Sequence, residues 1–501
     1  MEERVTRPDL AEAAEPQTPH LLKWIGLVAG PALFFIFLFF VRPEGMSAKA
    51  LAVLASTLWI ATWWITEAMP IPVTSLLPMV LYPVLGIAKM GEVAAPYSDP
   101  TVYLFLGGFL VALAVERWNL HRRIALGVIN LLGVSPGRLV LGFLSSTALL
   151  SMWLSNTATA MMMLPIGLAV VAQVTELQSK NLNGVELSPK GSSNFGTALM
   201  LSIAYGASIG GTGTLIGTPP NAILAGVVTK TLNTQIGFLD WMIFAVPLGI
   251  IFSAVTWFVL MKVFPPETKE IPGGKELIRN EIKALGPITR EELWALGVFL
   301  VVSFLWVTRP FLLAKVLPNV DDAVIAIFGG LLLFLIPTNL QKNQYMLTAE
   351  AVQKIPWGIL LLFGAGFSVA KAFQTSGLSE WLGKSLTGLQ DIGYLGVLIA
   401  AVTLVIFLTE VTSNTAIATL MMPIMAALGQ AINVSPMGLM VGAALAASFA
   451  FMLPVATPPN AIVFASGHVS IKQMARAGLW LNLVGIVVIT LFVYLVMPLI
   501  W

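Results

Sequence analysis

Two motifs occur twice in this chain, in the same order. SNTATAMMMLPI begins at Ser155 and SNTAIATLMMPI at Ser413, 258 residues later (413 − 155 = 258). GTPPNAI begins at Gly217 and ATPPNAI at Ala456, 239 residues later (456 − 217 = 239). The offsets differ by 19 residues (258 − 239 = 19), which fits a polar insertion at Gln178–Phe195 in the first copy only. A duplicated polar motif inside apolar sequence predicts two related halves that share one central site, the organisation of many transporters.

The composition places the chain in a membrane. Of its 501 residues 57% are hydrophobic and only 10% are charged, whereas soluble domains carry about 25% charged residues. We therefore expect a polytopic helical membrane protein. The net charge of +2 provides no basic field for nucleic acid.

Several classes of chemistry are excluded by the residues that the chain lacks. It has no cysteine, so disulfides, thiolate metal sites and cysteine nucleophiles are excluded. Its three histidines, His20, His121 and His468, have no metal-ligand spacing. The metalloprotease motif H-E-x-x-H does not occur.

The chain begins with a polar stretch that precedes the first apolar segment. Residues 1–20 are rich in acids and prolines and predict a disordered tail. Leu21–Val41 is long enough to span a bilayer and lacks a cleavage site for a signal peptide, so we expect a first span. Further apolar segments lie at about 51–88, 101–115, 139–174, 197–229, 240–264, 293–308, 323–337, 356–373, 393–432, 437–468 and 478–500. Several are long but interrupted by polar, Gly or Pro residues, which indicates re-entrant hairpins and discontinuous helices.

A basic linker separates the two halves. We divide the chain into a first half at 21–261, a linker at 262–292 and a second half at 293–501. The linker contains Lys262, Lys269, Lys275, Arg279, Lys283 and Arg290. By the positive-inside rule it is cytoplasmic, and we expect the N-terminus on the same side.

Both SNT motifs have the features of a helix start. Serine and asparagine favour N-cap positions, and the residues that follow Ser155–Thr157 and Ser413–Thr415 favour a helix. The first N–H groups of a helix bind anions. An asparagine amide can donate to a carboxylate while its carbonyl faces a cation.

Both TPPN motifs predict a second kind of helix start. Thr218 and Thr457 each precede a proline, which is favoured at the first helical position. In the first copy, Gly210, Gly211, Gly213 and Gly217 predict extended chain before the helix. Free carbonyl oxygens of unwound chain are hard ligands suited to sodium.

The four predicted helix starts carry no formal positive charge. Each helix N-terminus is equivalent to roughly +0.5 charge, so four together offset at most about two negative charges. No Arg or Lys lies within either motif. This balance predicts a dianionic substrate and favours co-bound cations.

Two acidic residues lie in apolar sequence near these motifs. Glu410 precedes Ser413 by three residues, and Glu67 lies in ITEAMPIP. Intramembrane acids are candidates for ion coupling. For Glu410 we keep two alternatives, a structural role at the hairpin tip and ion or proton coupling. For Glu67 we favour a structural role.

The motifs together resemble those of the divalent-anion:sodium symporter family, the sodium-coupled di- and tricarboxylate carriers. The resemblance rests on ITEAMPIPVTSLLP from Ile65, LTEVTSNTA from Leu408, both SNT motifs and both TPPN motifs. It implies an all-α inverted-repeat fold with about eleven transmembrane helices and two re-entrant hairpins. It also implies a homodimer whose scaffold domain carries a transport domain that moves as an elevator.

The resemblance also implies residue roles. The substrate residues it implies are Ser155, Asn156, Thr157, Thr218, Ser413, Asn414, Thr415 and Thr457. The implied sodium ligands are Ser151, Ser155, Asn156 and Gly217 at one site and Thr409, Thr412, Asn414 and Ala456 at another. Apart from sodium, which travels with the substrate, no organic cofactor is expected.

Three functional alternatives remain. The main hypothesis is sodium-coupled symport of C4 dicarboxylates such as succinate, malate or fumarate, in a bacterial plasma membrane. A sodium-independent dicarboxylate exchanger, or a carrier of citrate or sulfate, has the same motifs. An integral-membrane enzyme is a remote alternative, because the sequence contains no nucleophile, base or metal cluster to support it.

Overall fold

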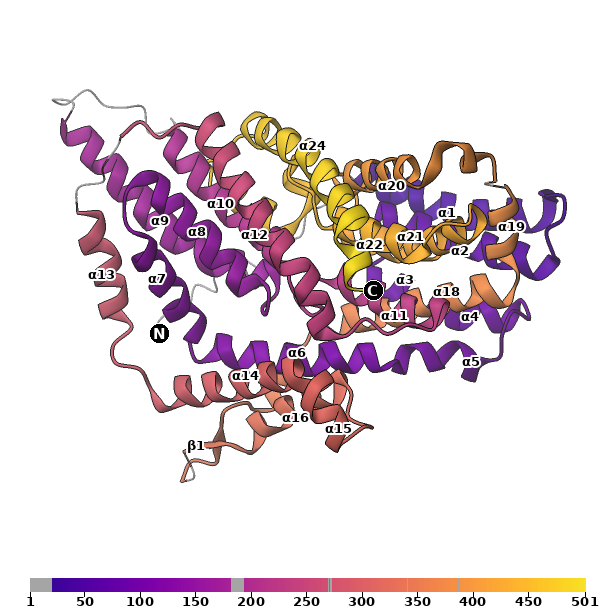
Figure 1. The fold of residues 1–501 in the computed structure, drawn as a ribbon, viewed down its shortest axis with the longest axis horizontal. Helices are drawn as coiled ribbons and strands as arrows, with labels where there is room; N and C mark the ends of the chain where they lie inside the picture. Colours follow the sequence, from indigo (N-terminus) through magenta and orange to yellow (C-terminus); the bar gives the residue numbers. More distant parts are fainter. Residues whose placement is uncertain (1–19, 182–192, 269, 271–272, 340, 386) are drawn as a thin grey trace, which may run out of the picture.

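The computed structural model describes residues 20–181, 193–268, 270, 273–339, 341–385 and 387–501. The predicted tail, except His20, and residues 182–192 of the predicted insertion lie outside this described part. The chain is a polytopic, predominantly helical membrane protein (Figure 1). Within the described residues, eight helices are long and apolar enough to cross a membrane. Four shorter apolar helical segments lie at Ile71–Val84, Asp322–Leu335, Gly393–Thr409 and Pro436–Ala447.

The first seven α-helices precede the first SNT motif. They are α1 His20–Phe40, α2 Ala48–Thr66, α3 Ile71–Thr74, α4 Leu77–Val84, α5 Met90–Ala94, α6 Pro100–Arg117 and α7 Leu120–Leu132. Helix α2 begins at the N-cap Ser47, whose side chain accepts from the N–H of Ala50, and ends at Glu67 in the left-handed region. The predicted interruption at Pro70 and Pro72 is present between α2 and α4.

The rest of the first half contains the two motifs at helix boundaries. Its helices are α8 Pro136–Ser151, α9 Asn156–Asn181, α10 Asn194–Gly211, α11 Pro219–Leu232 and α12 Phe238–Val263. The predicted breaks in the segments 139–174 and 197–229 therefore lie at the SNT and TPPN motifs.

The linker contains a helix of its own, α13 Gly274–Ala284, which packs against α7. Arg123 on α7 forms a two-pronged ion pair with Glu292, at 2.9 and 3.1 Å. Glu292 also closes a capping box with Thr289 at the start of the next helix. These contacts fix the end of the linker to the first half.

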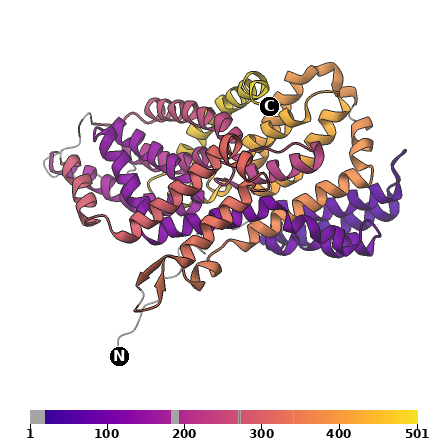
Figure 2. The same cartoon turned by 60° about the horizontal axis from the view of Figure 1, so that its bottom comes forward.

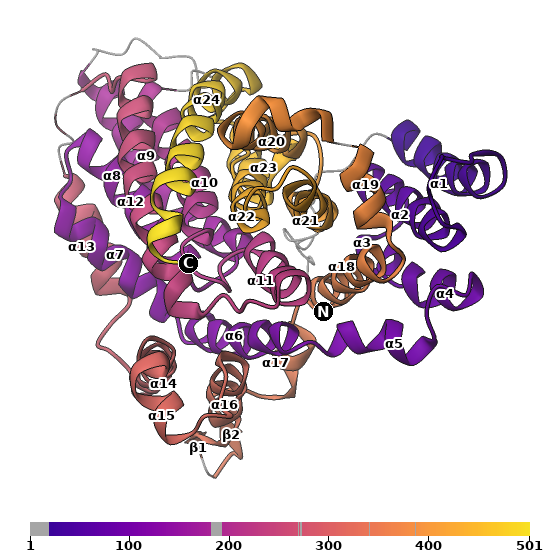
Figure 3. The same ribbon diagram turned by 45° about the vertical axis from the view of Figure 1, so that its right-hand side comes forward.

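The elements between the linker and the second repeat form a projecting group. They are α14 Arg290–Thr308, a π-helical turn at Arg309–Leu313, α15 Ala314–Val316, α16 Asp322–Leu335, β1 Pro337–Asn339, β2 Gln344–Tyr345 and α17 Ala349–Gln353. The strands pair antiparallel. Figures 2 and 3 show this group projecting from one side of the molecule.

The second half repeats the first, helix by helix. Its helices are α18 Trp357–Thr375, α19 Leu378–Ser385, α20 Gly393–Thr409, α21 Asn414–Ala431, α22 Pro436–Ala447, α23 Pro458–Ala465 and α24 Ile471–Leu495. Short 3-10 turns occur at Ala95–Ser98, Thr387–Ile392, Pro454–Ala456 and Met497–Leu499. Helices α18 to α24 follow the order of α6 to α12, and the paired helices overlap when the 258- or 239-residue offset is applied.

The apolar side chains form two cores. The larger core joins α6 to α12 with α14, α16 and most of the second half. The smaller core joins α1, α2, α4 and α5 to one face of α18 and to Ala416 and Leu420 of α21. Figure 3 shows α1 and α2 at one edge of the molecule, away from α8 and α9. The motif helices therefore lie in the larger core, with α18 and α21 shared between the two.

Candidate functional site

The first SNT motif forms the turn between α8 and α9. Ser151 ends α8, and its hydroxyl donates a 2.6 Å hydrogen bond to Asn156 Oδ1 at the start of α9. Ser155 Oγ accepts from the backbone N–H of Ala158, which is the predicted helix cap. Ser155 is exposed, and Asn156 and Thr157 are half-buried. The turn thus presents polar groups at a helix start.

The second SNT motif repeats this geometry. Thr409 ends α20, and its hydroxyl donates a 2.5 Å hydrogen bond to Asn414 Oδ1 at the start of α21. Both partners lie 258 residues after their counterparts (409 − 151 = 258 and 414 − 156 = 258). Ser413 is the N-cap but its side chain makes no capping hydrogen bond, so the two turns differ in this detail. The bond from hydroxyl to amide oxygen is common to both.

The TPPN motifs begin helices as predicted. Thr218 and Thr457 are the N-caps of α11 and α23, with φ of −145° and −144°, and a proline follows each. Thr457 Oγ1 accepts from the N–H of Asn460 at 3.3 Å, whereas the Thr218 side chain makes no such cap. Both threonines are buried.

The last residue of each TPPN motif has a role that the sequence analysis missed. Asn221 Nδ2 donates to the carbonyl oxygens of Gly211 and Thr214, and Asn460 Nδ2 donates to those of Ala450 and Leu453. These acceptors are equivalent (450 − 211 = 239 and 453 − 214 = 239). Both asparagines are fully buried, so they fix the unwound chain before each helix. The signal for this role is the repetition of the asparagine itself.

The extended chain in the first half is shorter than predicted. Gly210 and Gly211 lie inside α10, so only the residues after Gly211 are unwound. The prediction of extended chain at these two glycines is wrong, because both residues form the last turn of α10. Both glycines instead permit close approach: a Cβ at Gly211 would lie 2.5 Å from Asn156 Oδ1, and a Cβ at Gly210 would collide with the backbone of Ala148.

Three of the residues expected at the first sodium site lie together. Asn156 contacts Ser151 through its hydrogen bond and approaches Gly211, and Gly217 packs directly against the Gly211 carbonyl. Ser155, the fourth, directs its oxygen toward the N–H of Ala158. Gly211 was expected in the extended chain before the TPPN helix and was not among the four implied ligands of this site.

The residues expected at the second sodium site are less uniformly arranged. Thr409 contacts both Asn414 and the carbonyl oxygen of Ala447. Thr412 donates its hydroxyl to the Leu408 carbonyl, one turn back along its own chain. Ala456 is buried in the 3-10 turn that precedes Thr457. Thr409, Asn414 and Ala447 are therefore the oxygen-bearing residues that the contacts bring together.

Glu410 holds the second unwound segment. Its Oε1 accepts from the N–H groups of Phe451 and Met452, and its Oε2 accepts from those of Met452 and Leu453, all at 2.8–3.1 Å. Asn482 Nδ2 donates to Oε1 at 2.7 Å. Because both carboxylate oxygens are engaged by the protein, the geometry favours the structural alternative over ion coupling.

The first half fixes its unwound segment differently. The position equivalent to Glu410 is Met152 (410 − 258 = 152), and its backbone carbonyl accepts from the Thr214 hydroxyl. In the first half, a threonine hydroxyl donates to a backbone carbonyl. In the second half, three backbone N–H groups donate to a carboxylate at the equivalent place. The two halves reach the same connection between turn and unwound chain by unrelated chemistry.

The two halves are interleaved at these motifs. Helix α11, which follows the first TPPN motif, packs against α21, which follows the second SNT motif. Helix α23, which follows the second TPPN motif, packs against α9, which follows the first SNT motif. Tyr205 of α10 also donates its hydroxyl to the carbonyl oxygen of Phe451. The four motif helices therefore belong to one packed group.

The one basic residue on α11 is already paired. Lys230 Nζ lies 3.1 Å from Asp99 Oδ2 and 4.6 Å from the centre of the Phe367 ring. Asp99 also caps α6 by accepting from the N–H of Thr101. Lys230 is thus a link between α11, α6 and α18.

The remaining candidates lie apart from the motifs. Glu67 is the half-buried C-cap of α2, a helix that packs in the smaller core. His121 is buried on α7, where its Nδ1 lies 3.0 Å from the Val115 carbonyl, and burial lowers its pKa. Among the described residues, no group of three or more His, Asp or Glu side chains could hold a metal ion.

Comparison with known proteins identifies similar chains. Residues 21–501 match the family model described as the sodium:sulfate symporter transmembrane region. The chain is 48% identical over 478 residues to the sodium-dependent dicarboxylate transporter SdcS of Staphylococcus saprophyticus, covering 95% of this chain and 91% of that protein. It is 47% identical over 480 residues to the protein of the same name in Staphylococcus aureus, with the same coverage.

A solved structure is similar in fold. The crystal structure of the Alcanivorax borkumensis YdaH transporter aligns with a TM-score of 0.52 at 13% sequence identity, covering 96% of this chain and 98% of that one. At this identity the likeness concerns the fold alone, which is that of a membrane transporter.

Proposed function

Because the chain belongs to the sodium:sulfate (divalent-anion:sodium) symporter family, we propose that it carries C4 dicarboxylates such as succinate, malate and fumarate across the membrane together with sodium. The observation that carries the proposal is the duplicated turn. In each half, a hydroxyl at the end of one helix meets the amide oxygen of the SNT asparagine at the start of the next. Relatives that share nearly half of its residues are named sodium-dependent dicarboxylate transporters.

The turn suits two ligands of opposite charge. In our proposal the amide nitrogens of Asn156 and Asn414, with the hydroxyls and N–H groups of the adjacent serines and threonines, face the carboxylates. The full set consists of Ser155, Asn156, Thr157, Thr218, Ser413, Asn414, Thr415 and Thr457. The four helix starts and the co-bound cations then balance two negative charges.

The same turns supply oxygen ligands for sodium. Ser151 Oγ and Asn156 Oδ1 are 2.6 Å apart, and Thr409 Oγ1 and Asn414 Oδ1 are 2.5 Å apart. A hydroxyl and an amide oxygen that share a proton at this distance can instead share a cation after a small displacement, with the hydroxyl rotated to direct its lone pair. Ser155, Gly217, Thr412 and Ala456 would complete the two sites.

The remaining family properties extend the proposal. We place the N-terminus and linker on the cytoplasmic side of a bacterial plasma membrane, from the basic residues of the linker. We propose a homodimer, and an elevator-type movement of the motif helices relative to the rest. The transport role leaves no enzymatic activity to assign.

The decisive experiment is uptake of labelled succinate into proteoliposomes, with and without a sodium gradient and with and without internal dicarboxylate. Symport requires the sodium gradient and proceeds without internal dicarboxylate. Uptake that needs internal dicarboxylate and ignores sodium would identify an exchanger instead. Competition by citrate or sulfate in the same assay defines the anion class.

A matched pair of substitutions tests the sodium ligands. Thr409→Val keeps the shape of the side chain but removes the hydroxyl, whereas Thr409→Ser keeps the hydroxyl. We expect Thr409→Val to shift the sodium dependence of uptake to higher concentration and Thr409→Ser to stay near wild type. Equal sodium dependence in both variants would remove Thr409 from the cation site.

A further inference from the structure

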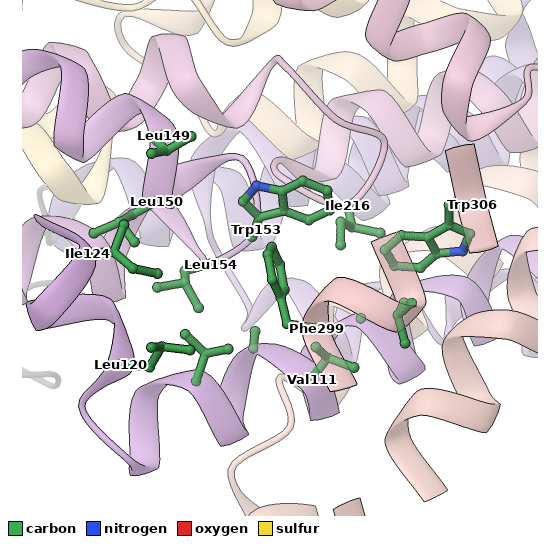
Figure 4. Close-up of a pocket in the computed structure, with 14 residues that line it drawn as sticks. Val111, Leu120, Ile124, Leu149, Leu150, Trp153, Leu154, Ile216, Phe299 and Trp306 are labelled. Carbon is green, nitrogen blue, oxygen red and sulfur yellow. The ribbon is translucent and has the colours of Figure 1, made fainter. Parts of the chain in front are cut away.

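An apolar cavity of about 120 Å³ lies behind the first SNT turn (Figure 4). All fourteen residues that line it are glycine, aliphatic or aromatic. Trp153, Phe299 and Trp306 form its aromatic walls. The Trp306 indole N–H donates to the Asp322 carbonyl oxygen, so that polar atom is satisfied by the protein. The cavity therefore offers mainly apolar contact area.

The cavity adjoins both motifs of the first half. Trp153 and Leu154 belong to the turn and directly precede Ser155, and Ile216 directly precedes Gly217. The opposite walls come from α6, α7 and α14, including Val111 and Phe299. A molecule in the cavity would thus touch the turn and the unwound chain on one side and three other helices on the opposite side.

The aromatic walls are arranged for a ring. Trp153 and Phe299 meet edge to face with centroids 4.8 Å apart and planes at 84°. Trp153 and Trp306 are nearly parallel, at 10°, with centroids 6.4 Å apart. Aromatic rings prefer edge-to-face and offset-stacked partners, so the ring of a ligand would find favourable neighbours beside these three side chains.

The surroundings of the cavity favour a ligand that dissolves in the bilayer. Most of the lining side chains are buried, but Leu149 of α8 is 42% exposed. Leu149 thus gives the cavity an apolar edge that is open to the surroundings of the protein. An apolar cavity of about 150 Å³ in another protein stays dry and binds benzene or xenon, which is close to the size seen here.

We propose that this cavity binds a small apolar molecule of the size of one aromatic ring, and that its occupancy slows transport by holding the first SNT turn in place. The effect on transport rests on the proposed function. Alternating access requires the motif helices to move relative to their surroundings. A ligand that contacts both Trp153 and Phe299 stabilises the one arrangement in which these walls face each other.

Direct binding is tested first, by thermal unfolding of the purified protein in detergent with and without benzene. Ala112→Leu fills the cavity from α6, and Ile124→Phe fills it from α7. Ala254→Leu makes the same size change at an exposed position of α12 and serves as the matched control. Benzene should raise the unfolding midpoint of the wild type and of Ala254→Leu by more than it raises the midpoint of either filled variant. Identical shifts in all four proteins would mean that benzene acts only through the detergent, and would overturn the site.

The effect on transport is tested in proteoliposomes with the same proteins. Benzene should lower the initial rate of sodium-driven succinate uptake severalfold in wild type and Ala254→Leu, and should leave the residual rate of the filled variants unchanged. Equal inhibition of all variants would indicate an effect on the bilayer and would overturn the regulatory role. Absence of succinate uptake in the wild type would refute the proposed function alone, because the unfolding experiment does not depend on transport.

Discussion

Replacing Glu410 by glutamine should loosen the second unwound segment while leaving the side chain almost the same size. The carboxylate accepts from three consecutive backbone N–H groups, at Phe451, Met452 and Leu453, and from the amide of Asn482. In glutamine, one of the two oxygens becomes an N–H₂ group. An amide nitrogen cannot accept from a backbone N–H, so the hydrogen bonds on the side of this nitrogen must break.

The size of the effect follows from these contacts. Suppose that the remaining oxygen keeps its hydrogen bonds from Phe451, Met452 and Asn482. The N–H of Leu453 then loses its acceptor, and the N–H of Met452 loses one of its two acceptors. A hydrogen bond to a charged group contributes about 1.5–3 kcal/mol, and burial of a neutral amide costs less than burial of a carboxylate. We therefore expect the free energy of unfolding to fall by about 2–4 kcal/mol.

Two measurements on the purified protein check this expectation. The thermal unfolding midpoint should fall in Glu410→Gln, and the backbone amides of 451–453 should exchange hydrogen faster. Glu44→Gln removes a charge at an exposed position and should change neither measurement. A variant with the wild-type midpoint and exchange rates but an altered sodium requirement for uptake would refute this reasoning and identify Glu410 as a coupling carboxylate.

Four further predictions concern the site. Asn156→Ala and Asn414→Ala should each abolish succinate uptake and leave the protein folded, because in the proposed site each amide faces both substrate and cation; near wild-type uptake by either would remove the central assignment. Asn221→Ala leaves the carbonyl oxygens of Gly211, Thr212 and Thr214 without their side-chain donor and should lower the free energy of unfolding by about 1–3 kcal/mol, whereas Asn130→Ala, at an exposed position of α7, should cost less; equal unfolding midpoints would contradict this. Uptake of succinate should decline as the pH falls below the second pKa of succinate, as expected if the dianion is the carried form, and a rate that follows the monoanion would disprove this. With more than two sodium ions per dianion, an inside-negative potential should accelerate uptake, each transported charge gaining about 2.3 kcal/mol per 100 mV, while a two-sodium cycle would be insensitive to potential.

The repeated motifs predicted the places where helices break. The boundaries at Ser151 and Asn156, and those at Thr409 and Asn414, lie where the two SNT motifs indicated them. These predictions succeed because N-cap residues and proline act locally, within one helical turn.

Features that depend on residues far away along the chain were harder to predict from the sequence. Gly210 and Gly211 have the composition of a loop, yet they are helical, and they pack closely against Ala148 of α8 and Asn156 of α9. The partners of Glu410 are more than 40 residues away, so its sequence context left two roles open. The pairing of Lys230 with Asp99 joins helices 131 residues apart (230 − 99 = 131), and no local pattern indicates it.

The crosswise packing of the halves has a consequence for how the protein is made. Residues Pro220–Val228 of α11 are buried, and their neighbours include α18, α21 and α22. Helix α18 begins at Trp357, 125 residues after α11 ends at Leu232 (357 − 232 = 125). During synthesis, α11 and its two prolines must therefore wait in the membrane without these partners while the ribosome completes the second half. An N-terminal fragment that ends in the linker would leave this surface of α11 permanently without its partners. We therefore expect such a fragment to be degraded in the membrane and not to persist as a stable half-transporter.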